Sequence, residues 1–274
     1  MSKLDSILWH RGVMAIVNAT PDSFYASSRT QSHNAVAKRV EQAIKEGAAI
    51  VDIGGYSSRP DADDVSVEEE WRRVDMALSA AREVSSDVAI SVDTFRSEVA
   101  RRACQKYGDI IVNDITGGLG DAEMLATVAE LGVPYVAMHM RGTPQTMQQL
   151  TKYDDVVAEV TAELRERLRA IEMAGIDPQR VALDPGFGFA KTVEQNYELL
   201  AALHRLTELG QPLLVGVSRK SMIYRVLGIT PDEALSATQA LHWEALRQGA
   251  TLLRVHDVKE AVEIIKLYEK FTER

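Results

Sequence analysis

The sequence predicts a single (β/α)8 barrel, a TIM barrel, as one domain spanning residues 1–274. Short apolar runs rich in Val, Ile and Leu recur along the whole chain, and segments with helical spacing alternate with them. No shift in composition and no long linker divides the sequence. Strands and helices that alternate in this way, in a chain of this length, are typical of a closed parallel barrel covered by helices.

Each apolar run is expected to form one strand of the barrel. The runs contain few polar residues, which is typical of parallel strands that are buried on both faces. The expected strands are Val13–Val17, Ala49–Ile53, Val88–Val92, Ile110–Val112, Tyr135–Met138, Val181–Leu183, Leu213–Val217 and Thr251–Val255.

Helices are expected between these strands. One begins at the capping box Ser66-x-x-Glu69, where acidic residues favour a helix N-terminus, and Trp71, Val74 and Leu78 then mark its buried face. The other expected helices are Ala35–Glu46, Ser97–Tyr107, Ala122–Leu131, Asp155–Ala174, Val193–Leu209, Asp232–Gln248 and Val258–Phe271. Six glycines that end helices predict left-handed C-caps, at Gly47, Gly108, Gly132, Gly175, Gly210 and Gly249.

Composition excludes several classes of protein. The chain is 46% hydrophobic and 26% charged, as globular proteins are, and its 31 basic and 40 acidic residues give a net charge of −9. An acidic chain is a poor general binder of nucleic acid or anionic membranes, so any bound anion needs a local cationic pocket. Cys104 alone cannot form an intramolecular disulfide, and we interpret it as a buried apolar residue. Without a signal-like or membrane-length apolar run, a cytoplasmic location is expected.

Polar or charged residues stand at the carboxyl ends of all the expected strands, at the end of a barrel where active sites form. Helix capping would explain a single Asp or Asn at such a place, but not a complete set. A polar group that directly follows a buried run needs a partner, and a bound polar ligand would supply one. The residues are Asn18, Asp52, Asp93, Asn113, His139, Asp184, Ser218–Lys220, and Arg254 with His256.

These strand-end residues divide by charge. Asp93, Asn113 and Asp184 offer oxygens that suit a ligand edge rich in N–H groups. The positive side chains suit phosphate or diphosphate, and they are Arg219, Lys220, Arg254 and His256. The pattern predicts a ligand with a nitrogen-rich ring at one end and an anionic group at the other. The alternative is that Arg254 and His256 pair with Asp257 or with nearby carboxylates.

Two early loops, residues 18–29 and 54–61, are long for connections from strand to helix and are rich in Gly, Ser and Pro. We interpret them as lids that close over a ligand, because Phe24 and Tyr56 would be costly to leave exposed. Surface turns with incidental aromatic residues are the alternative.

A set of short motifs resembles the dihydropteroate synthase family, and the match runs in order along nearly the whole chain. Any one motif is weak, whereas the full series in register is specific. The motifs are Asn18-Ala-Thr-Pro-Asp-Ser-Phe24, Asp52-Ile-Gly-Gly-Tyr-Ser-Ser-Arg-Pro60, Ser91-Val-Asp-Thr94, Val112-Asn-Asp-Ile115, Met138-His-Met-Arg-Gly-Thr-Pro144, Leu183-Asp-Pro-Gly-Phe-Gly188, Ser218-Arg-Lys-Ser221 and Arg254-Val-His-Asp257.

The resemblance implies a homodimeric enzyme of folate biosynthesis. It would join (7,8-dihydropterin-6-yl)methyl diphosphate to 4-aminobenzoate and release diphosphate. By motif position, the residues that bind the pterin diphosphate would be Asn18, Ser58, Asp93, Asn113, Met138, Asp184, Lys220, Arg254, Val255 and His256. The 4-aminobenzoate site would be Phe24, Ser58, Arg59, Pro60, Lys220 and Ser221. Asn18 would hold Mg2+, and the catalytic residues would be Lys220, Arg59 and Asp22.

The resemblance also implies a mechanism in which diphosphate leaves ahead of attack by the arylamine, so that electrostatics and exclusion of water matter more than a strong base. Three positions depart from the family pattern: Ala26 stands where an acidic residue is common, Tyr56 where Glu is common, and Ser58 where Thr is common. The first departure puts metal ligation by that loop in question, although Asp22 is able to replace the missing carboxylate.

Two other functions remain open from the sequence. One is the methyltetrahydrofolate-binding barrel of corrinoid-dependent methyl transfer, which would share the pterin-binding residues but has no diphosphate to hold. The cationic residues at the last two strands argue against it. The other is a non-catalytic pterin-binding barrel, which only the altered first loop favours.

Overall fold

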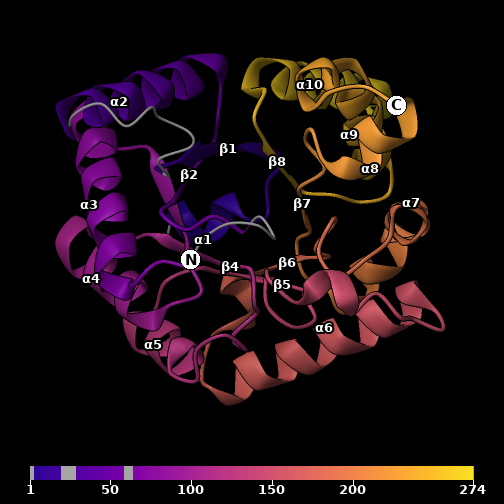
Figure 1. Cartoon of the computed structure of the whole chain (residues 1–274), viewed down its shortest axis with the longest axis horizontal. Helices are drawn as coiled ribbons and strands as arrows, with labels where there is room; N and C mark the ends of the chain where they lie inside the picture. The colour runs from indigo at the N-terminus through magenta and orange to yellow at the C-terminus, as the bar shows by residue number, and fades with distance from the viewer. Residues whose placement is uncertain (1–2, 20–28, 59–63, 274) are drawn as a thin grey trace.

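A computed structural model of the chain describes residues 3–19, 29–58 and 64–273. Eight parallel strands form one sheet in the order β6-β5-β4-β3-β2-β1-β8-β7, and a bridge between Leu183 and Leu213 joins its two edges into a nearly closed barrel (Figure 1). The strands are β1 (Gly12–Asn18), β2 (Ile50–Gly54), β3 (Ala89–Asp93), β4 (Ile111–Asp114), β5 (Tyr135–Met138), β6 (Val181–Asp184), β7 (Leu214–Val215) and β8 (Leu252–Val255). The predicted fold and all the predicted strands are therefore confirmed.

Helices surround this barrel (Figure 1). They are α1 (Lys3–Ile7), α2 (Arg29–Glu46), α3 (Val67–Val84), α4 (Ser97–Tyr107), α5 (Met124–Leu131), α6 (Val156–Met173), α7 (Val193–Ala201), α8 (Ser221–Leu227), α9 (Leu235–Arg247) and α10 (Val258–Thr272). The six predicted C-cap glycines all have positive φ, between 62° and 102°. Ser66 caps α3 as predicted, by accepting from the Glu69 N–H, but the Glu69 side chain pairs with Arg72 and Arg73.

Several helix boundaries differ from the prediction. The predicted helix 193–209 is divided into α7 and the 3-10 segment Leu203–Leu209, and α2 begins at Arg29 within the segment expected to be a loop. The short helices α1 and α8 were not predicted, because neither is long enough to show an apolar period. Cys104 is half-buried rather than fully buried, although Val99, Ala100 and Ala103 on the same face are buried.

The interior of the barrel is layered. Each strand contributes one residue to an apolar layer, which Leu8 completes from below: Met14, Ile50, Ala89, Ile111, Val136, Ala182, Leu214 and Leu252. Because side chains alternate along a strand, the residue two positions further on also points inward. This next layer is polar on several strands and consists of Ile16, Asp52, Ser91, Asn113, Met138, Asp184, Gly216 and Arg254. The fold therefore places polar side chains directly above an apolar floor, at the carboxyl ends of the strands.

No helix within the described ranges is long and apolar enough to cross a membrane.

Candidate active site

Arg254 connects three strands across the inner polar layer. Its Nε lies 2.7 Å from Oδ2 of Asp52, and its Nη2 lies 2.6 Å from Oδ2 of Asp93. The amide of Asn113 donates to the same Asp52 oxygen at 3.1 Å. Nearby carboxylates therefore do pair with Arg254, as the alternative interpretation held, but these carboxylates belong to the candidate site itself. The partner of Asp257 is Arg219.

Asp93 lies at a site that disfavours a charged carboxylate. Burial raises the pKa of Asp93, and the negative charges of Asp52 and Glu70 add to this effect, whereas Arg254 opposes it. Asp184 is 5% exposed, and burial raises its pKa against the opposing charge of Lys220 and a 2.7 Å hydrogen bond from the Gly186 N–H. Among the described residues, one oxygen of each of these carboxylates accepts no hydrogen bond. Both are thus placed to accept from a ligand.

Lys220 stands beside Asp184 at the end of β7. Its Nζ donates to the carbonyl of Phe187 and lies 4.8 Å from the centre of the Phe189 ring. Burial lowers the pKa of Lys220 to about 8, and Asp184 limits the fall. The ammonium is therefore largely charged at neutral pH but close to its titration range. Arg219, which the sequence grouped with it, is bidentate to Asp257 and has a left-handed backbone, so its guanidinium is committed to the loop.

An apolar wall faces these polar groups. Its buried members are Ile115, Met138, Met140, Met147 and Ala190, and the half-buried rings of Phe95 and Phe189 pack against them. Polarizable thioethers and aromatic rings suit contact with a flat heterocycle. The site thus combines acceptors, two cations and a surface for one face of a ring.

A second group of polar contacts lies just beyond the end of β8. His256 Nδ1 lies 3.0 Å from Ser218 Oγ, and the His256 carbonyl accepts from Arg39 at 2.6 Å. Desolvation and then the charge of Arg254 lower the pKa of His256 to about 4, although the residue keeps an exposed face. The Val255 side chain is fully buried in the main core, on the opposite side of the strand. Only the backbone of Val255 can therefore contact a ligand, as the alternation of side chains requires.

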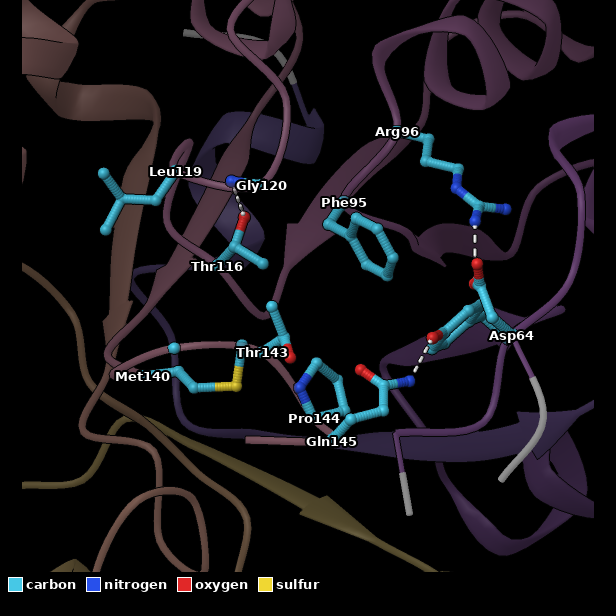
Figure 2. Close-up of a pocket in the computed structure, with 12 residues that line it drawn as sticks. Asp64, Phe95, Arg96, Thr116, Leu119, Gly120, Met140, Thr143, Pro144 and Gln145 are labelled. Atoms are coloured by element: carbon cyan, nitrogen blue, oxygen red, sulfur yellow. Dashed lines mark hydrogen bonds and ion pairs between the residues drawn. The ribbon is translucent and has the colours of Figure 1, made fainter. Parts of the chain in front are cut away.

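A cavity of about 750 Å3 opens beside this mouth, between the loops that follow β2, β3, β4 and β5 (Figure 2). Phe95 and Tyr56 meet edge to face at 5.0 Å in its wall, and Gln145 donates to the Tyr56 hydroxyl at 3.0 Å. Arg96 lies against both rings and pairs with Asp64 at 3.2 Å. Tyr56 is therefore held against the neighbouring loop rather than left on a bare turn.

Lys191 is a buried residue that the sequence analysis did not single out. Its Nζ lies 3.0 Å from His139 Nδ1 and donates to the carbonyls of Gly186 and Phe189, both at 3.0 Å. On the far side of the ring, His139 Nε2 lies 2.9 Å from Glu163. Burial lowers the pKa of Lys191 to about 7 and that of His139 to about 4. This chain of contacts holds the loop after Asp184, so His139, though a strand-end residue, supports the site from behind.

Four predicted residues lie outside the described ranges: Asp22, Phe24, Arg59 and Pro60. Ser58 is half-buried after β2, and Ser221 opens α8 directly after Lys220. Within the described ranges, no three His, Cys, Asp or Glu side chains gather as metal ligands. Asn18, half-buried at the end of β1, offers one amide oxygen. That donor fits Mg2+, which commonly takes one or two protein oxygens and completes its shell with water and substrate phosphate.

Comparison with known proteins agrees with this geometry. A family model described as "Pterin binding enzyme" matches residues 14–256. A dihydropteroate synthase of Escherichia coli K12 is 46% identical over 265 residues, which cover 96% of this chain and 92% of that protein. One from a Synechocystis species is 43% identical over 256 residues, with 93% and 88% covered.

Solved structures give the same likeness. The dihydropteroate synthase of Xanthomonas albilineans with 4-aminobenzoic acid has a TM-score of 0.90 and 42% identity, covering 97% of this chain and 95% of that one. The structure of that organism's enzyme in complex with 7,8-dihydropteroate has a TM-score of 0.86 and 40% identity over the same shares.

Proposed function

The chain belongs to the family of pterin-binding enzymes, and on that premise we propose that it is a dihydropteroate synthase. It condenses (7,8-dihydropterin-6-yl)methyl diphosphate with 4-aminobenzoate, giving 7,8-dihydropteroate and diphosphate in folate biosynthesis. The observation that carries this proposal is the barrel mouth, where the acceptors Asp93 and Asp184 stand beside the cations Lys220 and Arg254.

The pterin ring binds above the apolar floor. Its edge presents an exocyclic amino group and ring N–H groups, which donate to the unpaired oxygens of Asp93, Asn113 and Asp184. Hydrogen bonds to a carboxylate are the stronger kind, and they gain further from burial. Met138 supplies an apolar contact for one face of the ring, and the planar Arg254 guanidinium suits stacking on the other.

The carbon–oxygen bond between the pterin methylene and the diphosphate breaks first, and the diphosphate oxygen takes the electron pair. The electron-rich dihydropterin stabilises the resulting methylene cation. Arg254, which stays charged at every accessible pH, and the imidazole of His256 act on the charge that develops on the leaving group. These groups are fixed by Asp52, Asp93 and Ser218 before substrate binds, so little reorganisation is needed.

The arylamine nitrogen then adds to the methylene carbon and loses a proton. A neutral arylamine is already nucleophilic, so the protein must mainly orient it and exclude water that would intercept the cation. We assign the 4-aminobenzoate site to Ser58, Lys220 and Ser221 together with Phe24, Arg59 and Pro60, the last three by family resemblance alone. Asp22, Arg59 and Lys220 are the proposed catalytic residues on the same basis.

We propose Mg2+ as the cofactor, held by the Asn18 amide oxygen. When bound, it would supply positive charge to the diphosphate and so improve the leaving group. The residues of this chain orient the same phosphates through Arg254 and the end of β8.

A homodimer in the cytoplasm is also proposed. Exposed apolar side chains on α8 (Val226, Leu227) and α10 (Leu267, Phe271) support association, since they are 53–61% exposed. The single cysteine is in keeping with a reducing compartment. Analytical ultracentrifugation tests the dimer directly, and a monomer at micromolar concentration would contradict it.

Release of diphosphate tests the function. The enzyme is mixed with the pterin diphosphate, 4-aminobenzoate and Mg2+, and both diphosphate and dihydropteroate are measured. The proposal predicts equal amounts of the two products. Tight binding of pterin without release would instead support a non-catalytic pterin-binding barrel, and methyl transfer from methyltetrahydrofolate would support the corrinoid-linked alternative.

A further inference from the structure

Asp52, in the middle of the inner layer, contacts no substrate atom in the reaction described above. We propose that Asp52 is a positioning residue, which fixes the amide orientation of Asn113 and the position of the Arg254 guanidinium. Through these two side chains it determines which hydrogen-bonding groups face the edge of the pterin. This inference rests on the proposed function, because it concerns the pterin site of that enzyme.

The geometry joins Asp52 to both residues through one atom. Asp52 is 0% exposed, and its Oδ2 accepts from Arg254 Nε at 2.7 Å and from Asn113 Nδ2 at 3.1 Å. The three residues come from β2, β4 and β8, so the contact ties separate strands of the barrel together at the level of the ligand.

The hydrogen-bonding capacities of Asp52 and Asn113 fix the orientation of the Asn113 amide. As the partner of a guanidinium, Asp52 is a carboxylate, and its oxygens only accept hydrogen bonds. The group of Asn113 that faces Asp52 must therefore be the NH2, which leaves the amide oxygen for other partners. No hydrogen bond among the described residues takes that oxygen. Asp52 thus makes Asn113 present an acceptor to the ligand, which is what an N–H edge requires.

Arg254 is fixed by the same carboxylate. Its Nε is held by Asp52 and its Nη2 by Asp93, so the guanidinium plane is set by two anchors on neighbouring strands. Without Asp52, the guanidinium would be free to rotate about the remaining contact with Asp93. Both its stacking against a ring and its approach to a leaving group would then be less well defined.

Stability alone does not account for a carboxylate at this place. Oδ1 of Asp52 is buried and has no hydrogen-bond partner among the described residues, which carries a cost in free energy. A buried ion pair is often no more stabilising than well-packed apolar residues. The layer directly below shows that apolar side chains such as Ile50 and Ile111 fill the same interior well.

An exchange of the two side chains tests the idea. In Asp52→Asn the new amide can present either of its groups to Asn113, so the orientation of Asn113 is lost. In Asn113→Asp two carboxylates face each other. In the double variant D52N/N113D, the amide at position 52 donates to the carboxylate at 113, whose other oxygen again accepts from the ligand, while the amide oxygen at 52 receives Arg254. The total atom set and charge are those of the original pair.

We expect each single variant to weaken binding of 6-hydroxymethyl-7,8-dihydropterin at least tenfold in titration calorimetry, and the exchange to restore it to within threefold. Binding by N113D should recover as pH falls, because protonation of either carboxyl restores a hydrogen bond between them. Asp114→Asn is the matched control: its buried carboxylate holds Thr116, Gly118 and Tyr135 instead, so pterin affinity should change less than threefold even if melting temperature falls.

Three results would overturn the inference. If D52N folds and binds pterin as tightly as the parent, Asp52 has no positioning role in pterin binding. An exchange variant as weak as D52N shows that Asp52 does not act through the orientation of Asn113. If circular dichroism shows that neither D52N nor the double variant folds, the test is pterin binding by N113D. An affinity that does not change with pH then contradicts the proposal. Failure of the parent enzyme to release diphosphate, with normal pterin binding, would refute the proposed function and leave this inference about the pterin site standing.

Discussion

Replacing Asp184 with Ala tests the pterin-binding face most strongly. The carboxylate is 5% exposed, one oxygen holds the Gly186 N–H at 2.7 Å, and the other is open to a ligand. Removing it deletes the charge-assisted hydrogen bonds to the pterin and leaves the Gly186 N–H without its partner. Loss of one partner from a buried charged contact costs about 2–5 kcal/mol. At about 1.4 kcal/mol per tenfold, pterin affinity should fall by roughly 30-fold to several thousandfold.

Titration calorimetry with 6-hydroxymethyl-7,8-dihydropterin measures this loss without the diphosphate. For Asp184→Asn, the loss of pterin affinity should lie at the lower end of this range, because an amide oxygen can still accept from the Gly186 N–H. Asp121→Ala serves as the control: its carboxylate accepts from the Ser97 N–H at 2.8 Å but lies on the loop before α5, outside the barrel. Unchanged pterin affinity in folded Asp184→Ala would refute the reasoning that this carboxylate binds the ring edge.

Four further predictions concern other parts of the site. Burial lowers the pKa of Lys220 to about 8, and the charged form is the one that binds the pterin. Pterin affinity should therefore fall as pH rises through about 8, and a Lys220→Met variant should lack this dependence. An identical pH profile in the two proteins would contradict the prediction. Lys191→Met leaves two carbonyls and His139 without their donor, so urea denaturation should show a loss of about 1–3 kcal/mol, and undiminished stability would show that Lys191 does not hold the loop. Arg59→Ala should raise KM for 4-aminobenzoate and spare pterin affinity, whereas equal loss of both would disprove its assignment to the second substrate. Chelation by EDTA should slow diphosphate release and added Mg2+ should restore it; full activity in EDTA would exclude the proposed cofactor.

The sequence predicted the barrel because its signals are local and repeated. Apolar runs and helical spacing mark the strands and the longer helices, and glycines mark where helices end. The position of Asp93, Asn113 and Asp184 at the ends of expected strands then predicted that they share one mouth of the barrel. What could not be predicted were the contacts between residues far apart in the chain. Arg254 and Asp52 are separated by 202 positions and meet only through closure of the barrel.

The roles of individual cations were also beyond the sequence. Arg219 and Lys220 are neighbours with similar charge, yet a left-handed backbone at Arg219 directs it to Asp257 while Lys220 turns into the mouth. Lys191 gave no signal, because a lysine in a loop is ordinarily exposed and only the packed structure shows it to be 4% exposed.

A crystal structure with the pterin diphosphate and 4-aminobenzoate bound gives the most direct test. The account predicts that the ring lies above the apolar floor, with its N–H edge within hydrogen-bond distance of Asp93, Asn113 and Asp184 and its phosphates toward Arg254 and His256. A ring bound in the cavity lined by Tyr56, or an edge that faces Lys220 and Arg254 while the carboxylates remain unpaired, would contradict it.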